Sequence, residues 1–216
     1  MQKTPTSSCP RRSTPPSTGR GQCRDWRHAL PTLRGSSFIL REVERGDAQA
    51  LLAAISNEEV ARFIPPPPPT APRFRSFIVN AISQRKEGHS VCLAVLPSAS
   101  SRAIGLFHIR ALDPMFNDAE WGFAFAAEYW GTQVFTEAAR LVIEFSVSTL
   151  GVHRLEARVA VRNGRGNGAL RKLGAVQEGL LRRSFLRGGE YLDQVLWTIF
   201  AEDWDPGRIL ANPRAH

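Results

Sequence analysis

The chain lacks any apolar run approaching the roughly 20 residues that a membrane-spanning helix needs. It has little cysteine: Cys9, Cys23 and Cys92 are the three in 216 residues, and none shows the spacing of a metal site. An odd number of cysteines, with Cys92 in an expected core strand, indicates reduced thiols and a cytoplasmic setting. The N-terminal residues contain no apolar h-region, so we expect no secretory signal. These absences predict a reduced, cytoplasmic protein that binds neither a membrane nor a metal.

The net charge of +8 is concentrated at the N-terminus. Residues 1–34 hold seven of the 28 basic residues and one of the 20 acidic residues, so they carry +6 and leave +2 for the rest. This stretch is rich in Pro, Ser, Thr and Gly without apolar periodicity, which predicts a disordered tail. The remainder shows no basic helix or aromatic-basic stripe, which argues against a nucleic-acid partner. We expect one domain over 35–205 and a short C-terminal tail over 206–216.

Apolar periodicity through 35–205 alternates between the period of a strand and that of a helix. Strands are expected at 37–43, 90–96, 103–111, 119–125, 154–161, 176–185 and 190–200, and helices at 47–55, 73–86, 134–145 and 167–173. The run Pro65–Pro69 lacks the N–H groups that a helix or sheet needs, so we expect it to be extended. No internal repeat is visible, and the order of elements is β-α-α-β-β-β-α-β-α-β-β.

One segment stands between the strand at 119–125 and the helix at 134–145. Residues 129–138 read Tyr-Trp-Gly-Thr-Gln-Val-Phe-Thr-Glu-Ala. The N-terminus of a helix exposes unpaired N–H groups and the positive end of the helix dipole, both of which favour phosphate. Gly131, in the turn before the helix, allows close approach of the backbone to an anion. The segment therefore predicts a phosphate-binding loop.

A second segment, 161–179, reads Val-Arg-Asn-Gly-Arg-Gly-Asn-Gly-Ala-Leu-Arg-Lys-Leu-Gly-Ala-Val-Gln-Glu-Gly. Residues 129–138 resemble the acetyl-CoA pyrophosphate loop of the GNAT acyltransferases, Gln/Arg-x-x-Gly-x-Gly/Ala, and are similar to the ribosomal-protein N-acetyltransferase-like branch. Residues 161–179 resemble that family's block Asn-x-x-Ser-x-x-x-x-x-Lys-Leu-Gly-Phe followed by Glu-Gly. The resemblance covers roughly 33–204. This chain departs from the usual residues at Trp130, Gln133, Phe135, Gly166 and Ala175.

The resemblance implies an α/β (α+β) GNAT fold. This is a mostly antiparallel twisted sheet of about seven strands, with helices on both faces and one splayed parallel strand pair that receives the pantetheine arm. It implies acetyl-CoA as the acetyl donor and no metal. The cofactor-binding residues it implies are Phe123, Ala124, Phe125, Trp130, Gly131, Thr132, Gln133, Val134, Phe135, Thr136, Asn163, Gly166 and Lys172.

Acetyl transfer from a thioester to an amine requires a group that takes the amine proton. Glu120 aligns with a glutamate common in the related N-acetyltransferases and is our candidate base; the alternative is a structural ion pair with Arg110. Tyr191 is a candidate proton donor to the thiolate, or a core residue. Asp193 either positions substrate or holds a turn. No Ser-His-Asp or Cys-His set competes, so we expect direct attack by the amine.

The acceptor implied by the resemblance is a primary amine, either a protein N-terminus or a small molecule, in a groove formed partly by 57–72. The spacing of the histidines does not indicate a metal site, and we assign them no role. The rival interpretation is a non-catalytic CoA-binding or interaction module, because Gln133, Phe135 and Gly166 depart from the motifs. At Gln133 we expect helical dihedrals, which keep its N–H available to phosphate. We expect a monomer or a homodimer.

Overall fold

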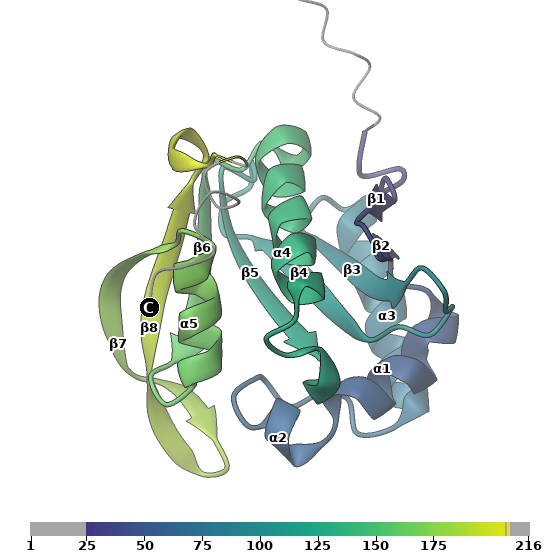
Figure 1. The fold of residues 1–216 in the computed structure, drawn as a ribbon, viewed down its shortest axis with the longest axis horizontal. Coiled ribbons are helices and arrows are strands. Elements are labelled where there is room, and N and C mark those ends of the chain that lie inside the picture. Colours follow the sequence, from purple (N-terminus) through teal and green to yellow (C-terminus); the bar gives the residue numbers. More distant parts are fainter. Residues whose placement is uncertain (1–24, 206, 208–216) are drawn as a thin grey trace, which may run out of the picture.

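The computed structural model describes residues 25–205 and 207, and its centre is a mixed sheet of eight strands (Figure 1). The strand order is β1-β2-β3-β4-β5-β6-β8-β7, and the pair β5–β6 is parallel while the other pairs are antiparallel. The strands are β1 (Leu33–Arg34), β2 (Phe38–Glu42), β3 (Ser90–Pro97), β4 (Gly105–Ala111), β5 (Asp118–Phe125), β6 (Arg154–Ala160), β7 (Val176–Arg187) and β8 (Glu190–Phe200). The expected mostly antiparallel sheet with one parallel pair is confirmed, with eight strands in place of about seven.

Helices cover both faces of the sheet (Figure 1). They are α1 (Ala48–Ile55), α2 (Glu58–Ala61), α3 (Ala71–Lys86), α4 (Gln133–Phe145) and α5 (Gly164–Lys172). Helix α3 begins two residues before the expected start, because Thr70 accepts a hydrogen bond from the N–H of Arg73 and Pro72 is tolerated in a first turn. Helices α4 and α5 lie on one face, and α1 and α3 on the other.

The alternation of side chains along a strand divides the interior into two cores. On β5, Trp121 and Phe125 are buried beneath α4, whereas Ala124 is buried on the face covered by α1 and α3. Phe107 of β4 lies at the centre of the first core, with its ring stacked on that of Trp121 at a centroid distance of 6.0 Å. Both faces of the central strands are therefore apolar except where a cavity opens.

Residues 25–34 pack on the domain, in contrast to the expected disorder of the whole 1–34 stretch. The side chain of Trp26 is 6% exposed and meets the ring of Phe116 edge-on at 5.3 Å. Arg85, buried on α3, donates hydrogen bonds to the carbonyl oxygens of Trp26 and Arg27. Strand β1 then pairs with β2. The ordered domain therefore begins before residue 35, while the rest of the expected tail, 1–24, lies outside the described residues, as does 206–216 apart from Gly207.

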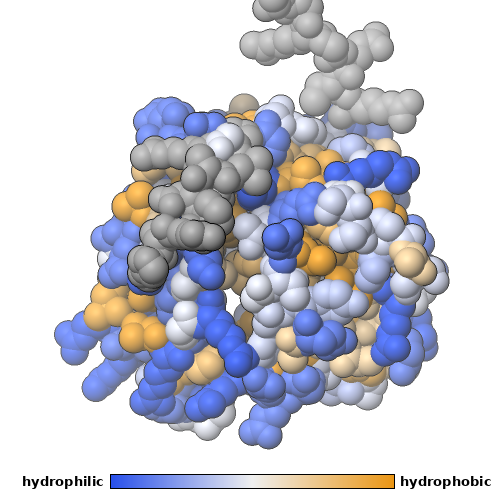
Figure 2. Space-filling model, viewed as in Figure 1, coloured by the Kyte–Doolittle hydropathy of each residue, from blue (hydrophilic) through white to orange (hydrophobic). Residues whose placement is uncertain are grey.

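Strand β7 forms one edge of the sheet and exposes apolar side chains, seen at the left edge of Figure 2. These are Val176, Leu180 and Leu186, each more than half exposed. Two irregularities, at 177–179 and 181–185, interrupt its pairing with β8, and irregularities of this kind bend a strand. Within 25–205, none of the helices is long and apolar enough to cross a membrane.

Candidate active site

The loop between β5 and α4 turns sharply at Gly131. This residue has φ of +70°, in the left-handed region that favours glycine, and it is exposed. Gln133 is the first residue of α4 and is not among the described residues with positive φ. The expectation of helical dihedrals at this position is therefore confirmed. A glycine is unnecessary at 133, because Gly131 already provides the turn.

The N-terminus of α4 has no cap from a side chain. Thr132 occupies the N-cap position, but its hydroxyl donates to the carbonyl oxygen of Tyr129 at 2.7 Å and is thus turned away from the helix. The N–H groups of Gln133, Val134 and Phe135 have no hydrogen-bond partner among the described residues. Three unpaired donors at the positive end of a helix of 13 residues are an arrangement that favours an anion.

Two aromatic side chains of the loop have structural contacts. The indole N–H of Trp130 donates to the carbonyl oxygen of Phe125 at 3.0 Å, which closes the end of β5. The guanidinium of Arg165 lies over the Trp130 ring at 4.6 Å from its centroid. Phe135 packs against the rings of Phe107, Phe123 and Phe125 at 4.8–6.3 Å. Phe135 is thus a core side chain whose backbone alone faces the anion site, so the usual Gly or Ala is not required there.

Strands β5 and β6 separate soon after they meet. Their pairing is limited to Asp118–Glu120 against Arg154–Glu156. Asp118 and Ala126 both hydrogen-bond toward the β4 side, at 2.8 and 2.9 Å, so the even-numbered residues between them do the same. The backbone groups of Trp121 and Phe123 therefore point into the gap beside β6. Those of Ala124 belong to the ladder with β4, so of the expected pantetheine-pairing residues Phe123 is open and Ala124 is not.

The first turn of α5 is closed by its own side chains. The Oδ1 of Asn163 accepts a hydrogen bond from the N–H of Gly166 at 2.9 Å, which caps the helix. A Cβ at position 166 would meet Asn163 Nδ2 at 2.7 Å and Val159 Cγ1 at 3.0 Å. The missing serine is explained, because the cap occupies the space its side chain would need. Lys172 is exposed in the last turn, roughly 12 Å along the helix axis from Gly164 at 1.5 Å per residue.

A cavity of about 640 Å³ opens at the gap between β5 and β6, on the face covered by α1 and α3. Its walls come from β4, β5 and β6, from the segment Phe63–Pro68, and from α1 and α3. Asn163 and Gly166 also line it, at the start of α5. The part of 57–72 that lines this cavity is Phe63–Pro68, which includes four of the five prolines of the run. Its charged lining residues are Arg110, Glu120 and Arg158, and its other titratable lining residue is His108.

Glu120 forms an ion pair with Arg110, at 2.5 Å between Oε2 and Nη2, across the register of β4 and β5. Two roles were expected for Glu120, a catalytic base or a structural ion pair with Arg110, and this contact is that ion pair. His108 lies two residues before Arg110 on β4, so the two side chains share one face of the sheet. Its partner on β5 is Gly122, which has no side chain and leaves room beside the imidazole. Burial, followed by the positive charge of Arg110, lowers the pKa of His108, while Glu120 raises it to a smaller extent. The imidazole is therefore neutral at neutral pH and has no hydrogen-bond partner within the described residues.

Sequence reasoning missed His108, since one histidine without metal spacing forms no pattern. The feature that could have indicated His108 is the pairing of β4 with β5. The observed register of these strands places His108 and Glu120 on the same face of the sheet. Tyr191 and Asp193 do not line the cavity. Tyr191 is 61% exposed on the β7–β8 hairpin. Asp193 accepts a hydrogen bond from the N–H of Arg183 at 2.7 Å and so holds the irregular turn of β7, where Arg183 has φ of +50°.

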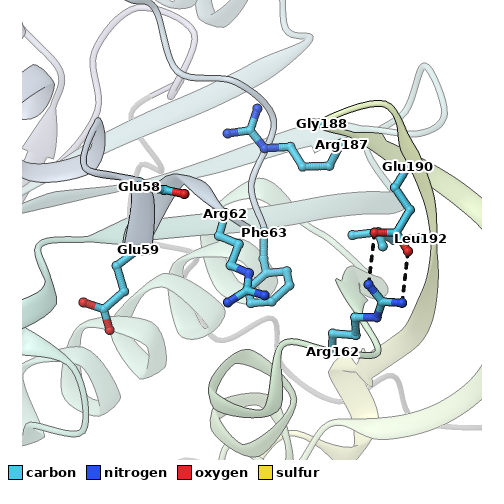
Figure 3. Close-up of a pocket in the computed structure, with 9 residues that line it drawn as sticks. All are labelled: Glu58, Glu59, Arg62, Phe63, Arg162, Arg187, Gly188, Glu190 and Leu192. Atoms are coloured by element: carbon cyan, nitrogen blue, oxygen red, sulfur yellow. Dashed lines mark hydrogen bonds and ion pairs between the residues drawn. The ribbon is translucent and has the colours of Figure 1, made fainter.

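A second hollow, of about 920 Å³, lies between α2 and the β7–β8 hairpin (Figure 3). In this outer groove Arg162 forms two ion-pair contacts with Glu190, drawn as dashed lines in Figure 3. Phe63 lines both the outer groove and the cavity and thus stands between them. Charged side chains therefore surround the outer groove, whereas the cavity behind Phe63 is mostly apolar.

The splayed parallel strand pair beside an uncapped helix N-terminus is the arrangement that the resemblance to the GNAT acyltransferases implies. The Acetyltransferase (GNAT) domain model matches residues 37–176, and the chain belongs to this family. It is 27% identical over 171 residues to the uncharacterized N-acetyltransferase YoaA of Bacillus subtilis, covering 79% of this chain and 97% of that protein. The expected family and the expected activity as an acetyltransferase are confirmed.

Curated relatives with named acceptors differ from one another. The chain is 29% identical to the ribosomal protein uS5-alanine N-acetyltransferase of Escherichia coli, over 57% of this chain and 64% of that protein. It is also 29% identical to the spermidine N(1)-acetyltransferase of Escherichia coli, over 51% and 62%. RimJ of Mycobacterium smegmatis, solved with CoA-disulfide, superposes with a TM-score of 0.75 at 20% identity, over 87% of this chain and 95% of that chain. That likeness concerns the fold alone.

Proposed function

We propose that this protein transfers the acetyl group of acetyl-CoA to a primary amine by direct attack. The observation that carries the proposal is the cavity at the gap between β5 and β6, beside the uncapped N-terminus of α4. The amine nitrogen attacks the thioester carbonyl carbon, the carbon–sulfur bond breaks, and the CoA thiolate leaves and takes a proton. Alignment of the two reactants across the gap supplies much of the catalysis.

The donor is held at two places in this scheme. Its pyrophosphate accepts hydrogen bonds from the N–H groups of Gln133, Val134 and Phe135, where the helix dipole also favours negative charge. Its pantetheine arm follows the open backbone of Trp121 and Phe123. In our proposal an N–H group of this strand also stabilises the thioester oxygen as that oxygen gains charge.

The proton of the incoming ammonium passes to His108 in our proposal, and Glu120 binds the ammonium. An imidazole that is neutral and unpartnered is ready to accept a proton, whereas Glu120 would first have to leave Arg110. Glu120 remains a catalytic residue here, because its carboxylate contacts the substrate. The role differs from the base expected from the sequence.

Binding and turnover test the function together. CoA and acetyl-CoA should raise the melting temperature of the protein, and NAD should not. Release of the CoA thiol should then depend on a primary amine, with mass spectrometry locating the acetyl group on nitrogen. Stabilisation by CoA without transfer to any amine would support the rival interpretation, a non-catalytic CoA-binding module. Stabilisation by NAD alone would contradict both interpretations.

The pH dependence of kcat distinguishes His108 from Glu120 as the group that accepts the proton. Neutral His108 accepts the proton, so kcat should fall as pH drops through a pKa below the usual value of about 6.5 for histidine. His108→Gln should remove this acid limb and lower kcat by roughly 100-fold or more. The matched variant Glu120→Gln should raise the KM for the amine and keep the limb. Wild-type kcat and an unchanged limb in His108→Gln would instead assign the proton to Glu120.

A further inference from the structure

The lining residues that come neither from the sheet nor from the start of α5 are apolar, and we call the part of the cavity that they line the arm. They are Phe63 to Pro68, together with Ile55 of α1 and Phe74 and Phe77 of α3. The rings of Phe74 and Phe77 meet edge-on at 5.6 Å, so packing fixes their positions. Proline has no N–H group, and four consecutive prolines therefore offer this arm no backbone donors.

Charge in the cavity is confined to the end at the sheet. Arg110 and Arg158 give two positive charges, and Glu120 is the single carboxylate. Arg110 pairs with Oε2 of Glu120 at 2.5 Å, so in our proposal the other carboxylate oxygen, Oε1, serves the one reacting ammonium. Arg158 lies on β6 and has Glu156 at 3.8 Å, but Glu156 does not line the cavity. The lining residues thus contain no second carboxylate for a second ammonium.

We infer that the acceptor is a primary amine on an apolar body that carries no second cationic group. This inference rests on the proposed function and names the substrate class of the same site. Removal of apolar surface from water in the arm favours binding. An ammonium carried into the same arm would lose its hydration and find no counter-charge there, which disfavours di- and polyamines.

The outer groove is the place where a diamine would find a carboxylate. Glu58 and Glu59 of α2 and Glu190 of β8 line it together with Phe63, which lies between the two α2 glutamates and Glu190 in Figure 3. Glu190 is paired with Arg162 and Glu59 with Arg165, each at 3.0 Å. An amine that stays within the apolar arm does not reach these groups.

The sharpest test compares hexylamine with 1,6-diaminohexane, which differ by one terminal ammonium. With wild-type protein and acetyl-CoA, kcat/KM should be at least tenfold higher for hexylamine. If the acceptor is a protein N-terminus, kcat/KM should likewise be higher for a peptide beginning with leucine than for the same peptide beginning with lysine. If the acceptor is a small molecule, hexylamine should be acetylated and neither peptide should be. Equal or better use of the diamine would overturn the inference.

A designed carboxylate provides the matched experiment. Pro67→Glu places an acid in the lining of the arm and should raise the relative use of the diamine at least tenfold. Pro69→Glu changes the next-but-one proline, which does not line the cavity, and should leave the preference unchanged. Equal effects of the two variants would contradict the assignment of the arm.

A binding measurement separates failure of this inference from failure of the proposed function. Calorimetry on the CoA-bound protein should detect hexylamine and detect the diamine at least tenfold more weakly, whether or not turnover occurs. Selective binding of hexylamine without acetyl transfer would support the inferred amine site and contradict the proposed catalytic function. Tighter binding of the diamine would remove the inference and leave acetyl transfer intact.

Discussion

The first turns of α4 and α5 both follow a strand on the same face of the sheet, yet they differ in how their N–H groups are satisfied. At α5, Asn163 caps the N–H of Gly166, and the side chain of Asn167 adds four further hydrogen bonds to the surroundings. At α4, the N-cap hydroxyl of Thr132 is engaged with Tyr129, and the first N–H groups have no partner among the described residues. A side-chain cap such as Asn163 on the N–H of Gly166 supports the fold, whereas a helix end without a side-chain cap leaves its N–H groups to a ligand phosphate.

The comparison changes how the resemblance to the acetyltransferases applies to individual residues. Asn163 was expected to meet the cofactor, but its Oδ1 is used by the helix itself. Gly166 belongs to the same arrangement, since a side chain there would meet Asn163. By contrast, Gln133 departs from the motif without disturbing the site, because its backbone is helical and its side chain is exposed.

The largest effect should come from removing the side chain that ties α5 to the sheet. Asn167 is buried, accepts a hydrogen bond from the indole N–H of Trp197 at 2.8 Å, and donates to Ala160 at 3.0 Å. Asn167→Ala leaves a buried indole N–H without a partner and should lower the free energy of unfolding by about 2–4 kcal/mol. Chemical denaturation measures this. Asn80→Ala, an exposed position on α3, is the matched control and should change the free energy little.

A smaller loss of stability is expected at the cap. Asn163→Ala should lower the free energy of unfolding by about 1 kcal/mol, and Asn163→Ser should restore most of it because serine also accepts at the N-cap. The affinity for CoA, measured by calorimetry, should stay within about threefold, or roughly 0.6 kcal/mol. A large loss of affinity with unchanged stability would show that Asn163 serves the cofactor and would erase the contrast between the two helix ends.

Only a limited change in affinity is expected from restoring the usual glycine at position 133. Gln133→Gly keeps the N–H group and removes an exposed side chain, so the affinity for acetyl-CoA should change by less than tenfold, or about 1.4 kcal/mol. Calorimetric titration of both proteins provides the comparison. Binding by the glycine variant alone would favour a degraded loop and the non-catalytic interpretation.

Local patterns were enough to predict most elements of this fold. Alternation predicted the central strands, and the helical period predicted α4, because each signal lies within about a dozen residues. Strand β1 and the packing of Trp26 were not predictable in this way. They depend on Phe116 and Arg85, which are distant in the chain, and residues 25–34 have no periodicity of their own.

The parts of the candidate site that depend on the local backbone were predictable from the sequence. The parts that depend on contacts between residues distant in the chain were less so. Gly131 and the start of α4 follow from the residues of the loop. The ion pair between Glu120 and Arg110, and the place of His108 beside it, follow only from the register of two strands. Asp193 illustrates the same limit, because its hydrogen bond to Arg183 depends on an irregularity in β7 that no local pattern indicates.

The central claim, that the open N-terminus of α4 binds the pyrophosphate of CoA, is tested most directly by Gln133→Pro. Proline is tolerated at the first position of a helix, and Thr132 has φ of −84° and ψ of 162°, which suit a residue before proline. The variant therefore removes one N–H donor and leaves the helix intact. Loss of one hydrogen bond to a charged group, about 1.5–3 kcal/mol, predicts roughly 10- to 150-fold weaker CoA binding by calorimetry, with an unchanged melting temperature of the free protein. CoA binding equal to that of the wild type in a folded Gln133→Pro protein would contradict the account.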